Sequence, residues 1–261
     1  MSTQPLDAVP LWMLFAATCA LVGAAVEGGY RLGRWRHARA EGEKEAPVGA
    51  MVGSILALFA FMLAFTFGLA ATRFEARRQA VLDEANAVGT TYLRAQLLRD
   101  ERQRAESVRL LREYVGVRLR GAREGEFEEA VARSEQLHDA LWAEARKAAA
   151  SDPTPVTGLY IQSLNEMIDL HASRVHAAVR SRIPPSIWAA LAALALLSMA
   201  SVGYQAGLSV TRRSPAMLGL VLAFSGVLLL IADLDRPQGG LIAVSQQAMV
   251  DVEKSVGAGP P

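Results

Sequence analysis

The chain has 261 residues, of which 52% are hydrophobic and 20% are charged. Its net charge is only +1, which gives no overall basic signal for nucleic-acid binding. Four stretches contain no Asp, Glu, Lys or Arg, and each is long enough as a helix to cross a bilayer core of ~30 Å. They lie between Asp7 and Glu27, between Glu45 and Arg73, between Arg182 and Arg212, and between Arg213 and Asp233.

These uncharged stretches predict an all-α integral membrane protein with four transmembrane helices. A lipid core offers no partners to backbone N–H and C=O groups, so a segment that crosses it must be helical. We prefer this interpretation to four buried helices of a soluble protein. The second and third spans are expected to extend into a soluble helical bundle. The expected domains are residues 1–72, 73–182, 183–235 and 236–261.

The first span is expected over residues 11–26. It is more typical of a retained helix than of a cleaved signal peptide, because the first ten residues contain no Lys or Arg. Cys19 lies inside it and is the only cysteine, so no internal disulfide can form. A short basic loop, "RLGRWRHARAEGEKEAP", is expected to follow, with Pro47 opening the second span.

The second span covers residues 48–72 and is predicted to continue out of the membrane as a helix. Only Gly89, a weak breaker, interrupts the residues that follow it. Apolar side chains recur there at helical spacing with charges between them, which is typical of a helix packed on other helices. These side chains are Val81, Leu82, Ala85, Val88 and Tyr92.

Three more helices are expected in the soluble bundle, over residues 107–119, over residues 127–149 and from residue 159 onward. The last one leads through Pro184 and Pro185, which should kink or restart it, into the third span. The third and fourth spans are expected to form a hairpin around Arg212 and Arg213. The tail, residues 236–261, is polar, and we expect it to be partly disordered.

The sequence carries no recognisable catalytic machinery, so we predict that the protein is not an enzyme and uses no cofactor. It contains no HExxH, CxxC or GxSxG motif and no glycine-rich phosphate loop. No ionisable residue lies inside a span, so a buried proton relay has no carrier. Asp169 near His171 could suggest a metal site, but we prefer a solvated helix face, because His171 and His176 do not share a face.

The stretch "FMLAFTFGLAATRFEARR", residues 61–78, is uncharged up to Thr72 and basic beyond it. Its arginines can be anchors at the membrane surface, or a ring of positive charge that concentrates anions at a pore mouth. Phe61 and Phe65 share one helix face. They can be packing residues, or they can form a hydrophobic constriction if they are repeated around a symmetry axis.

At this stretch the sequence resembles the bestrophins. Their second transmembrane helix carries Phe-x-x-Gly-Phe, an apolar run, and then Thr-Arg and an aromatic residue. The matching residues here are Phe61, Ala64, Phe65, Thr72, Arg73 and Phe74, followed by Glu75 and Arg77. Bestrophins also carry Asn/Asp-Pro-Phe-Gly after the fourth span, where this chain has "DRPQGG" with Asp235, Pro237 and Gly239. Together the two motifs are similar to a bacterial family of bestrophin-like membrane proteins of unassigned function.

The resemblance implies a homo-oligomeric, pentameric anion channel in a bacterial inner membrane, gated by a neck on the second span. The neck positions would be Ala57, Phe61 and Phe65, and the vestibule or helix exit would carry Arg73, Arg77 and Arg78. The implied partners are the lipid bilayer, further copies of the chain, and anions such as chloride. Calcium activation is not implied, because Gly240, Leu241, Ile242 and Ala243 replace the expected carboxylates.

Two questions stay open at this level. The alternative function is a membrane-anchored sensor or scaffold whose helical bundle binds a partner protein. The second question is which side of the membrane carries the bundle. The short basic loops favour an external bundle by the positive-inside rule. The resemblance implies a cytoplasmic bundle, and we follow it. The arginines beside the membrane on the bundle side nearly match the positive charge of the loops. They are Arg73, Arg77, Arg78, Arg174, Arg180 and Arg182.

Overall fold

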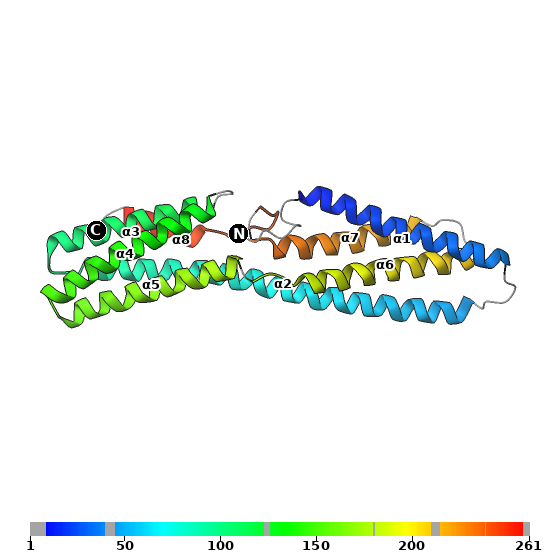
Figure 1. The fold of residues 1–261 in the computed structure, drawn as a ribbon, viewed down its shortest axis with the longest axis horizontal. Coiled ribbons are helices and arrows are strands. Elements are labelled where there is room, and N and C mark those ends of the chain that lie inside the picture. Colours follow the sequence, from blue (N-terminus) through cyan, green and yellow to red (C-terminus); the bar gives the residue numbers. More distant parts are fainter. Residues whose placement is uncertain are drawn as a thin grey trace. The chain divides into compact units, whose positions relative to one another are not determined.

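The computed structural model describes residues 9–39, 45–122, 126–179, 181–209, 215–237 and 239–257. These residues form eight α-helices and no strand (Figure 1). The helices are α1 (Leu11–Arg39), α2 (Glu45–Ala95), α3 (Glu101–Arg120), α4 (Phe127–Ser151), α5 (Pro155–Val179), α6 (Pro185–Leu208), α7 (Pro215–Asp235) and α8 (Gln247–Gly257).

The chain divides into two compact units. Unit 1 contains residues 1–72, 182–236 and 240–242, and unit 2 contains residues 73–181, 237–239 and 243–261. Unit 1 therefore holds α1, the first part of α2, α6 and α7. Unit 2 holds the rest of α2 with α3, α4, α5 and α8.

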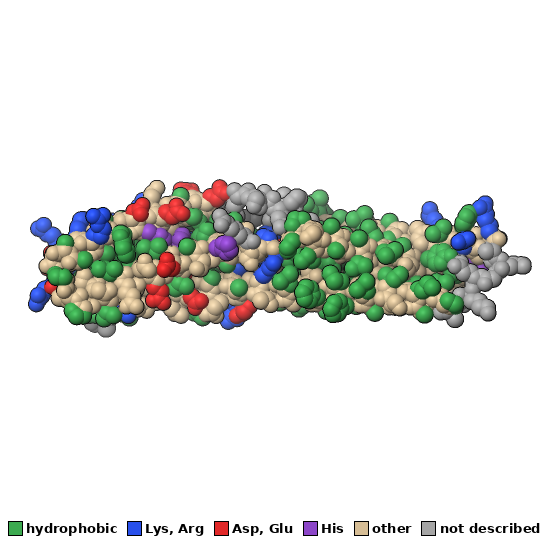
Figure 2. Space-filling view, turned by 60° about the horizontal axis from the view of Figure 1, so that its bottom comes forward, with side chains coloured by type: hydrophobic (Ala, Val, Ile, Leu, Met, Phe, Trp, Pro, Cys, Tyr) green, Lys and Arg blue, Asp and Glu red, His purple; other side chains and the backbone are tan. Residues whose placement is uncertain are grey.

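Four helices are long and apolar enough to cross a membrane, which confirms the all-α fold with four expected spans. They cover Leu11–Arg39, Pro47–Ala95, Pro185–Leu208 and Pro215–Asp235. Figure 2 shows many hydrophobic side chains on the visible face of unit 1. The 51 residues of α2 measure about 77 Å at ~1.5 Å per residue, more than twice the ~30 Å of a bilayer core. The prediction that this helix continues beyond the membrane is thus confirmed.

Glycines bring α1 and α6 into close contact within unit 1. A Cβ atom added at Gly29 would clash with the carbonyl oxygen of Ala200, and one at Gly203 would clash with that of Val26. Gly33 and Gly207 also face each other, with Gly33 Cα 3.0 Å from where a Gly207 Cβ would lie. Small residues at such positions let two membrane helices pack backbone against backbone, where dispersion replaces the missing hydrophobic driving force.

The basic segment after the first span is helical rather than a loop. Helix α1 continues to Arg39, because no proline interrupts it and Arg31 Nε donates to Glu27 Oε1 one turn earlier at 2.8 Å. Residues 40–44 of the expected loop lie outside the described residues, as do Arg212 and Arg213 of the expected hairpin. Residues 45–47, the end of the expected loop, already belong to α2.

Unit 2 is a helical bundle around one apolar core. Helix α3 starts six residues earlier than expected, because Asp100 caps it by accepting from the N–H groups of Arg102 and Gln103 at 2.9 Å each. Helix α5 ends at Val179 and α6 begins at Pro185, so the two prolines restart the helix as predicted. The fully buried side chains of the core include Val88, Leu111, Leu141, Tyr160, Leu164, Met167 and Met249.

The tail contributes a helix to this bundle. Residues 247–257 form α8, whose Met249 and Val256 are buried in the core of unit 2. Arg112 Nε donates to the carbonyl oxygen of Val256 at 2.9 Å. Residues 247–257 of the tail are therefore packed, while residues 258–261 lie outside the described part of the chain.

Candidate functional site

Within unit 1, one face of α2 packs against the other spans. Phe59, Leu63, Thr66 and Ala70 recur at helical spacing and are almost completely buried. The ring of Phe59 lies 5.0 Å from that of Phe224 on α7, centroid to centroid. This face fixes α2 to the rest of unit 1.

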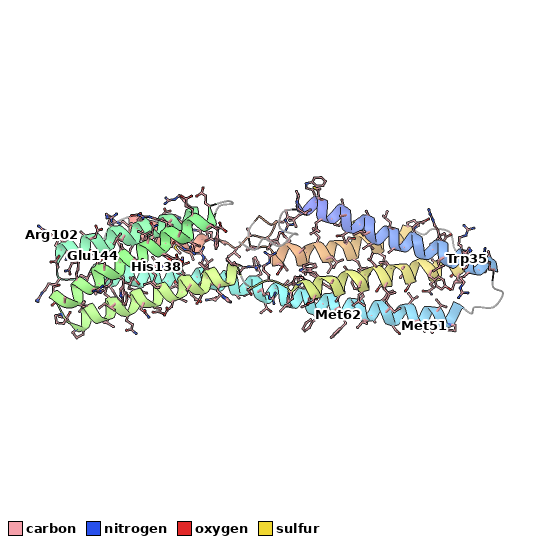
Figure 3. The ribbon with its side chains drawn as sticks, in the orientation of Figure 1. Trp35, Met51, Met62, Arg102, His138 and Glu144 are labelled. Carbon is pink, nitrogen blue, oxygen red and sulfur yellow. The ribbon has the colours of Figure 1, made fainter. Side chains whose placement is uncertain are left out.

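The opposite face of α2 carries the three predicted neck residues. Ala57, Phe61 and Phe65 are exposed in the protomer, and Phe61 and Phe65 expose 66% and 61% of their surface. The exposed line continues through Gly68 to Thr72. Met62, the neighbour of Phe61 in the chain, is labelled in Figure 3 and shows where this part of α2 lies. The chain offers no charged residue between Glu45 and Arg73, so this face is uncharged throughout.

Such a face can do one of two things in a membrane. It can contact lipid tails, or it can face copies of itself around a common axis. Large apolar surfaces left uncovered on a protomer mark contact sites. Two phenylalanines one turn apart would form two stacked rings on such an axis.

The three arginines predicted at the helix exit occupy different environments. Arg73 is half-buried, and its Nη1 is buried without a hydrogen-bond partner. Arg77 is only 4% exposed. Arg78 is exposed, and its Nη1 lies 3.1 Å from Glu75 Oε1.

The end of α7 is held by two buried carboxylates. Asp233 accepts from the backbone N–H groups of Leu241 and Ile242, at 2.9 and 3.0 Å, which folds the chain back behind the helix. Asp235 accepts from the N–H of Ile183 at 2.9 Å and from Arg182 Nε at 3.1 Å. This ties the end of α7 to the segment just before α6.

The other predicted residues of this turn are described too. Pro237 follows the helix, and Gly239 has φ of 74°, a conformation that favours glycine. Arg236 Nη2 donates to the carbonyl oxygen of Val9 at 2.5 Å. Sequence reasoning named Asp235, Pro237 and Gly239 but missed Asp233, although an acidic residue at the end of an uncharged span was a usable signal.

The sequence model of one protein family, described as the bestrophin-like domain, matches residues 19–249. The chain belongs to the bestrophin-like family. This confirms the resemblance inferred from the two motifs, and it makes the chain a member of a membrane-protein family with several candidate spans.

Solved structures show the same fold. Two crystal structures of a membrane protein, each of a variant with one alanine substitution, align over 94% of this bestrophin-like chain and over 97% and 96% of their own chains. Their TM-scores are 0.65 and 0.66, at 12% and 11% sequence identity. At this identity the likeness concerns the fold alone. No curated protein sequence matches the chain.

A second polar site lies inside the bundle of unit 2, around Glu84 of α2. Its carboxylate is fully buried and accepts from Arg118 Nε at 2.9 Å, from Arg174 Nη1 at 2.5 Å and from the Tyr114 hydroxyl at 2.5 Å. Arg174 Nη2 also donates to Gln246 Oε1 at 2.7 Å. One carboxylate therefore joins α2, α3, α5 and the segment before α8.

Electrostatics keep this carboxylate ionised. Burial raises the pKa of Glu84, but the hydrogen bond with His171, the charges of Arg118 and Arg174 and the Tyr114 hydroxyl together lower it well below its usual range. Burial, and then the Glu84 charge, raise the pKa of Tyr114 well above its usual value, so its hydroxyl keeps the proton that it donates.

His171 belongs to this site, so the expectation of a solvated helix face is wrong for it. The side chain is 4% exposed, because it lies on the same face of α5 as the buried Leu164 and Met167. Its Nδ1 lies 3.1 Å from the Tyr114 hydroxyl oxygen and 3.5 Å from Glu84 Oε1. Among the described residues, no group of three His, Cys, Asp or Glu side chains is arranged to hold a metal ion.

Proposed function

We propose that the protein is a homo-oligomeric membrane channel that conducts anions, with a hydrophobic neck lined by Phe61 and Phe65 of α2. The observation that carries this proposal is the uncharged face of α2, which leaves both phenylalanines exposed while the opposite face is packed. Membership of the bestrophin-like family supports it. Ala57 occupies the next turn on the same face and would line a wider ring.

A pore along this face needs several copies of the chain. In unit 1 the exposed face of α2 is not enclosed by α1, α6 or α7, so one protomer cannot surround a water path. A closed ring of identical subunits places the same residue at the same depth in every copy. Rings of phenylalanine at a narrow axis expel water and hold the path closed until the helices move. The resemblance to bestrophins favours five subunits.

The anion preference in this proposal rests on the end of the span. Arg73 follows the last uncharged turn of α2 and is the first cation after the span. Repeated around the axis, these guanidinium groups would concentrate anions at one mouth of the pore. The resemblance to bestrophins favours a bacterial inner membrane, with the bundle of unit 2 in the cytoplasm.

Crosslinking tests the position of the neck. With Cys19 replaced by serine, Phe61→Cys should give disulfide-linked dimers on mild oxidation, because equivalent positions face one another across the axis. Leu218→Cys is the matched control, since Leu218 is equally exposed at 63% but lies on α7. It should stay monomeric. Dimers from Leu218→Cys and none from Phe61→Cys would mean that α2 does not line the axis. That result would favour the membrane-anchored scaffold instead.

A further inference from the structure

A groove of ≈ 610 Å³ lies within unit 1 between α1, α2 and α6. It is found where α1 and α6 finish and α2 begins, and its walls are largely apolar, with Leu32 of α1, Met51 of α2 and Ala200 of α6 among them. The groove is open at Gly28 of α1, where an added Cβ atom would meet no other atom within 4 Å. Its volume falls within the range of about 300–1,000 Å³ that is typical of ligand sites.

The α1 wall of this groove changes from apolar to aromatic to basic along one helix face. Residues 25, 28, 32, 35 and 39 follow one another at spacings of three and four, so they share that face. Trp35 and Arg39 therefore continue the line of Gly28 and Leu32, and both are exposed. The Arg39 guanidinium carbon lies 4.4 Å from the centroid of the Trp35 ring. Figure 3 labels Trp35 on α1 and Met51 on the α2 wall.

Positive charge collects at this end of unit 1. Helix α1 carries four arginines and one acidic residue, Glu27, which pairs with Arg31 at 2.8 Å. In the described part of the chain, no carboxylate pairs with Arg36 or Arg39. Residues 40–45 and 210–214, which connect the helices at this end, contain three basic and three acidic residues and leave the balance unchanged. Figure 2 shows basic side chains here beside the hydrophobic surface.

The order of these residues along α1 matches the layers of a phospholipid. From Ala25 to Leu32 the groove covers about 10 Å at ~1.5 Å per residue, within the ~15 Å of hydrocarbon in one leaflet. Trp35 lies one turn further, and tryptophan favours the boundary between hydrocarbon and head groups. On α2, Val48 of the groove lies nine residues before Ala57 and hence on the opposite side. The groove therefore faces lipid whether or not copies of the chain meet at Ala57.

We propose that this groove binds one acyl chain of an anionic phospholipid, and that Arg36 and Arg39 bind its phosphate. The chain lies against Leu32 and Met51, in the space that Gly28 leaves open. The guanidinium groups donate to the phosphate oxygens, a geometry that arginine favours. The head group thereby supplies the counter-charge that the described residues lack, as basic pockets between membrane helices do for other anionic lipids. The site is independent of the proposed pore, and its test requires no ion flux.

Native mass spectrometry of the full-length, delipidated protein in detergent tests the site. The probes are dioleoyl phosphatidylglycerol, which carries a net negative charge, and dioleoyl phosphatidylcholine, which has the same chains and no net charge. An arginine close to an anionic lipid contributes a factor of about five in affinity, so two should favour phosphatidylglycerol by about 25-fold. The measurement counts bound lipids per chain and gives the mass of the oligomer at the same time.

Two pairs of variants assign the head group and the chain separately. Arg36→Gln/Arg39→Gln should weaken phosphatidylglycerol binding by about tenfold or more and leave phosphatidylcholine unchanged. Arg31→Gln/Arg34→Gln removes the same charge from the same end of α1, but away from the groove-facing line, and should change binding by less than about threefold.

Gly28→Leu fills the groove and should weaken both lipids by about tenfold, the effect of about two buried methylene groups. Gly23→Leu is its control, because Gly23 also has open space around it but does not line the groove. Both leucines fit without a clash and all four arginines are exposed, so these variants should fold.

Several results would overturn the proposal. Equal affinity for the two lipids would remove the role of the head group. An equal loss of phosphatidylglycerol binding in the Arg36/Arg39 and Arg31/Arg34 variants would reduce the site to general attraction by a basic surface. Lipid binding that is unchanged in Gly28→Leu would exclude the groove. A smaller oligomer in Gly28→Leu, with lipid binding retained, would mean that a second copy of the chain covers the groove instead.

Discussion

Replacing Glu84 with glutamine should loosen the bundle of unit 2. The substitution preserves volume and can preserve the bond to Tyr114, but it removes the charge that neutralises Arg118 and Arg174. The buried net charge then rises from +1 to +2. Removing one partner of a buried ion pair costs about 3–5 kcal/mol. We expect a value near the lower end, about 3 kcal/mol, because the side chain of Arg174 is 11% exposed and can reach water.

Hydrogen exchange measured by mass spectrometry gives this free energy for the bundle itself. Amides of α3 and α5 should exchange about 100-fold faster in Glu84→Gln, since ~1.4 kcal/mol is a factor of ten. Glu106→Gln is the matched control, because Glu106 pairs with Arg109 on the surface and such pairs contribute only about 0–1 kcal/mol. The assay must resolve a change of about a factor of two in exchange rate. Exchange rates in Glu84→Gln that stay within about threefold of those of the unmodified protein would refute the reasoning.

Three further predictions concern other parts of the chain. Gly203→Ala should lower the stability of unit 1 by about 1–3 kcal/mol in thermal unfolding, because its Cβ meets the backbone of α1, whereas Gly226→Ala, with open space around it, should not. The stability of the bundle should fall as pH drops from 6.5 towards about 4, because His138 stays neutral in the fold while the unfolded chain takes up a proton; His138→Gln should flatten this dependence in hydrogen exchange measured against pH. Arg73→Glu should reduce the chloride-to-sodium permeability ratio in planar bilayers. An unchanged ratio would mean that the charge of Arg73 does not act in the vestibule.

Sequence patterns predicted those features that depend on composition along a single helix. The four spans followed from uncharged stretches, and the length of α2 followed from the absence of a strong breaker between Pro47 and Ala95. Membership of the bestrophin-like family followed from "TRF" and "DRPQGG". The basic segment after the first span was misread as a loop, since charge marks where a helix leaves lipid and not where it ends.

The Glu84 site could not be predicted in the same way. The residues that bond to Glu84 lie up to 90 positions from it in the chain. Nothing local in "DEANA" sets Glu84 apart from neighbouring surface acids. His171 was different, because its spacing from Leu164 and Met167 already put it on the buried face of α5. The helical tail α8 was missed because its buried positions, Met249 and Val256, are too few to form a strong periodic pattern.

Chloride efflux from liposomes tests the central proposal most directly. Oligomers of the unmodified protein and of Phe61→Ala/Phe65→Ala are reconstituted at equal density, with Leu218→Ala/Leu222→Ala on the exposed side of α7 as the control. The neck account predicts faster efflux from the Phe61/Phe65 variant alone, because the wider and less apolar constriction stays wet. The absence of chloride efflux from both the unmodified protein and the Phe61/Phe65 variant, in correctly assembled oligomers, would contradict the neck account.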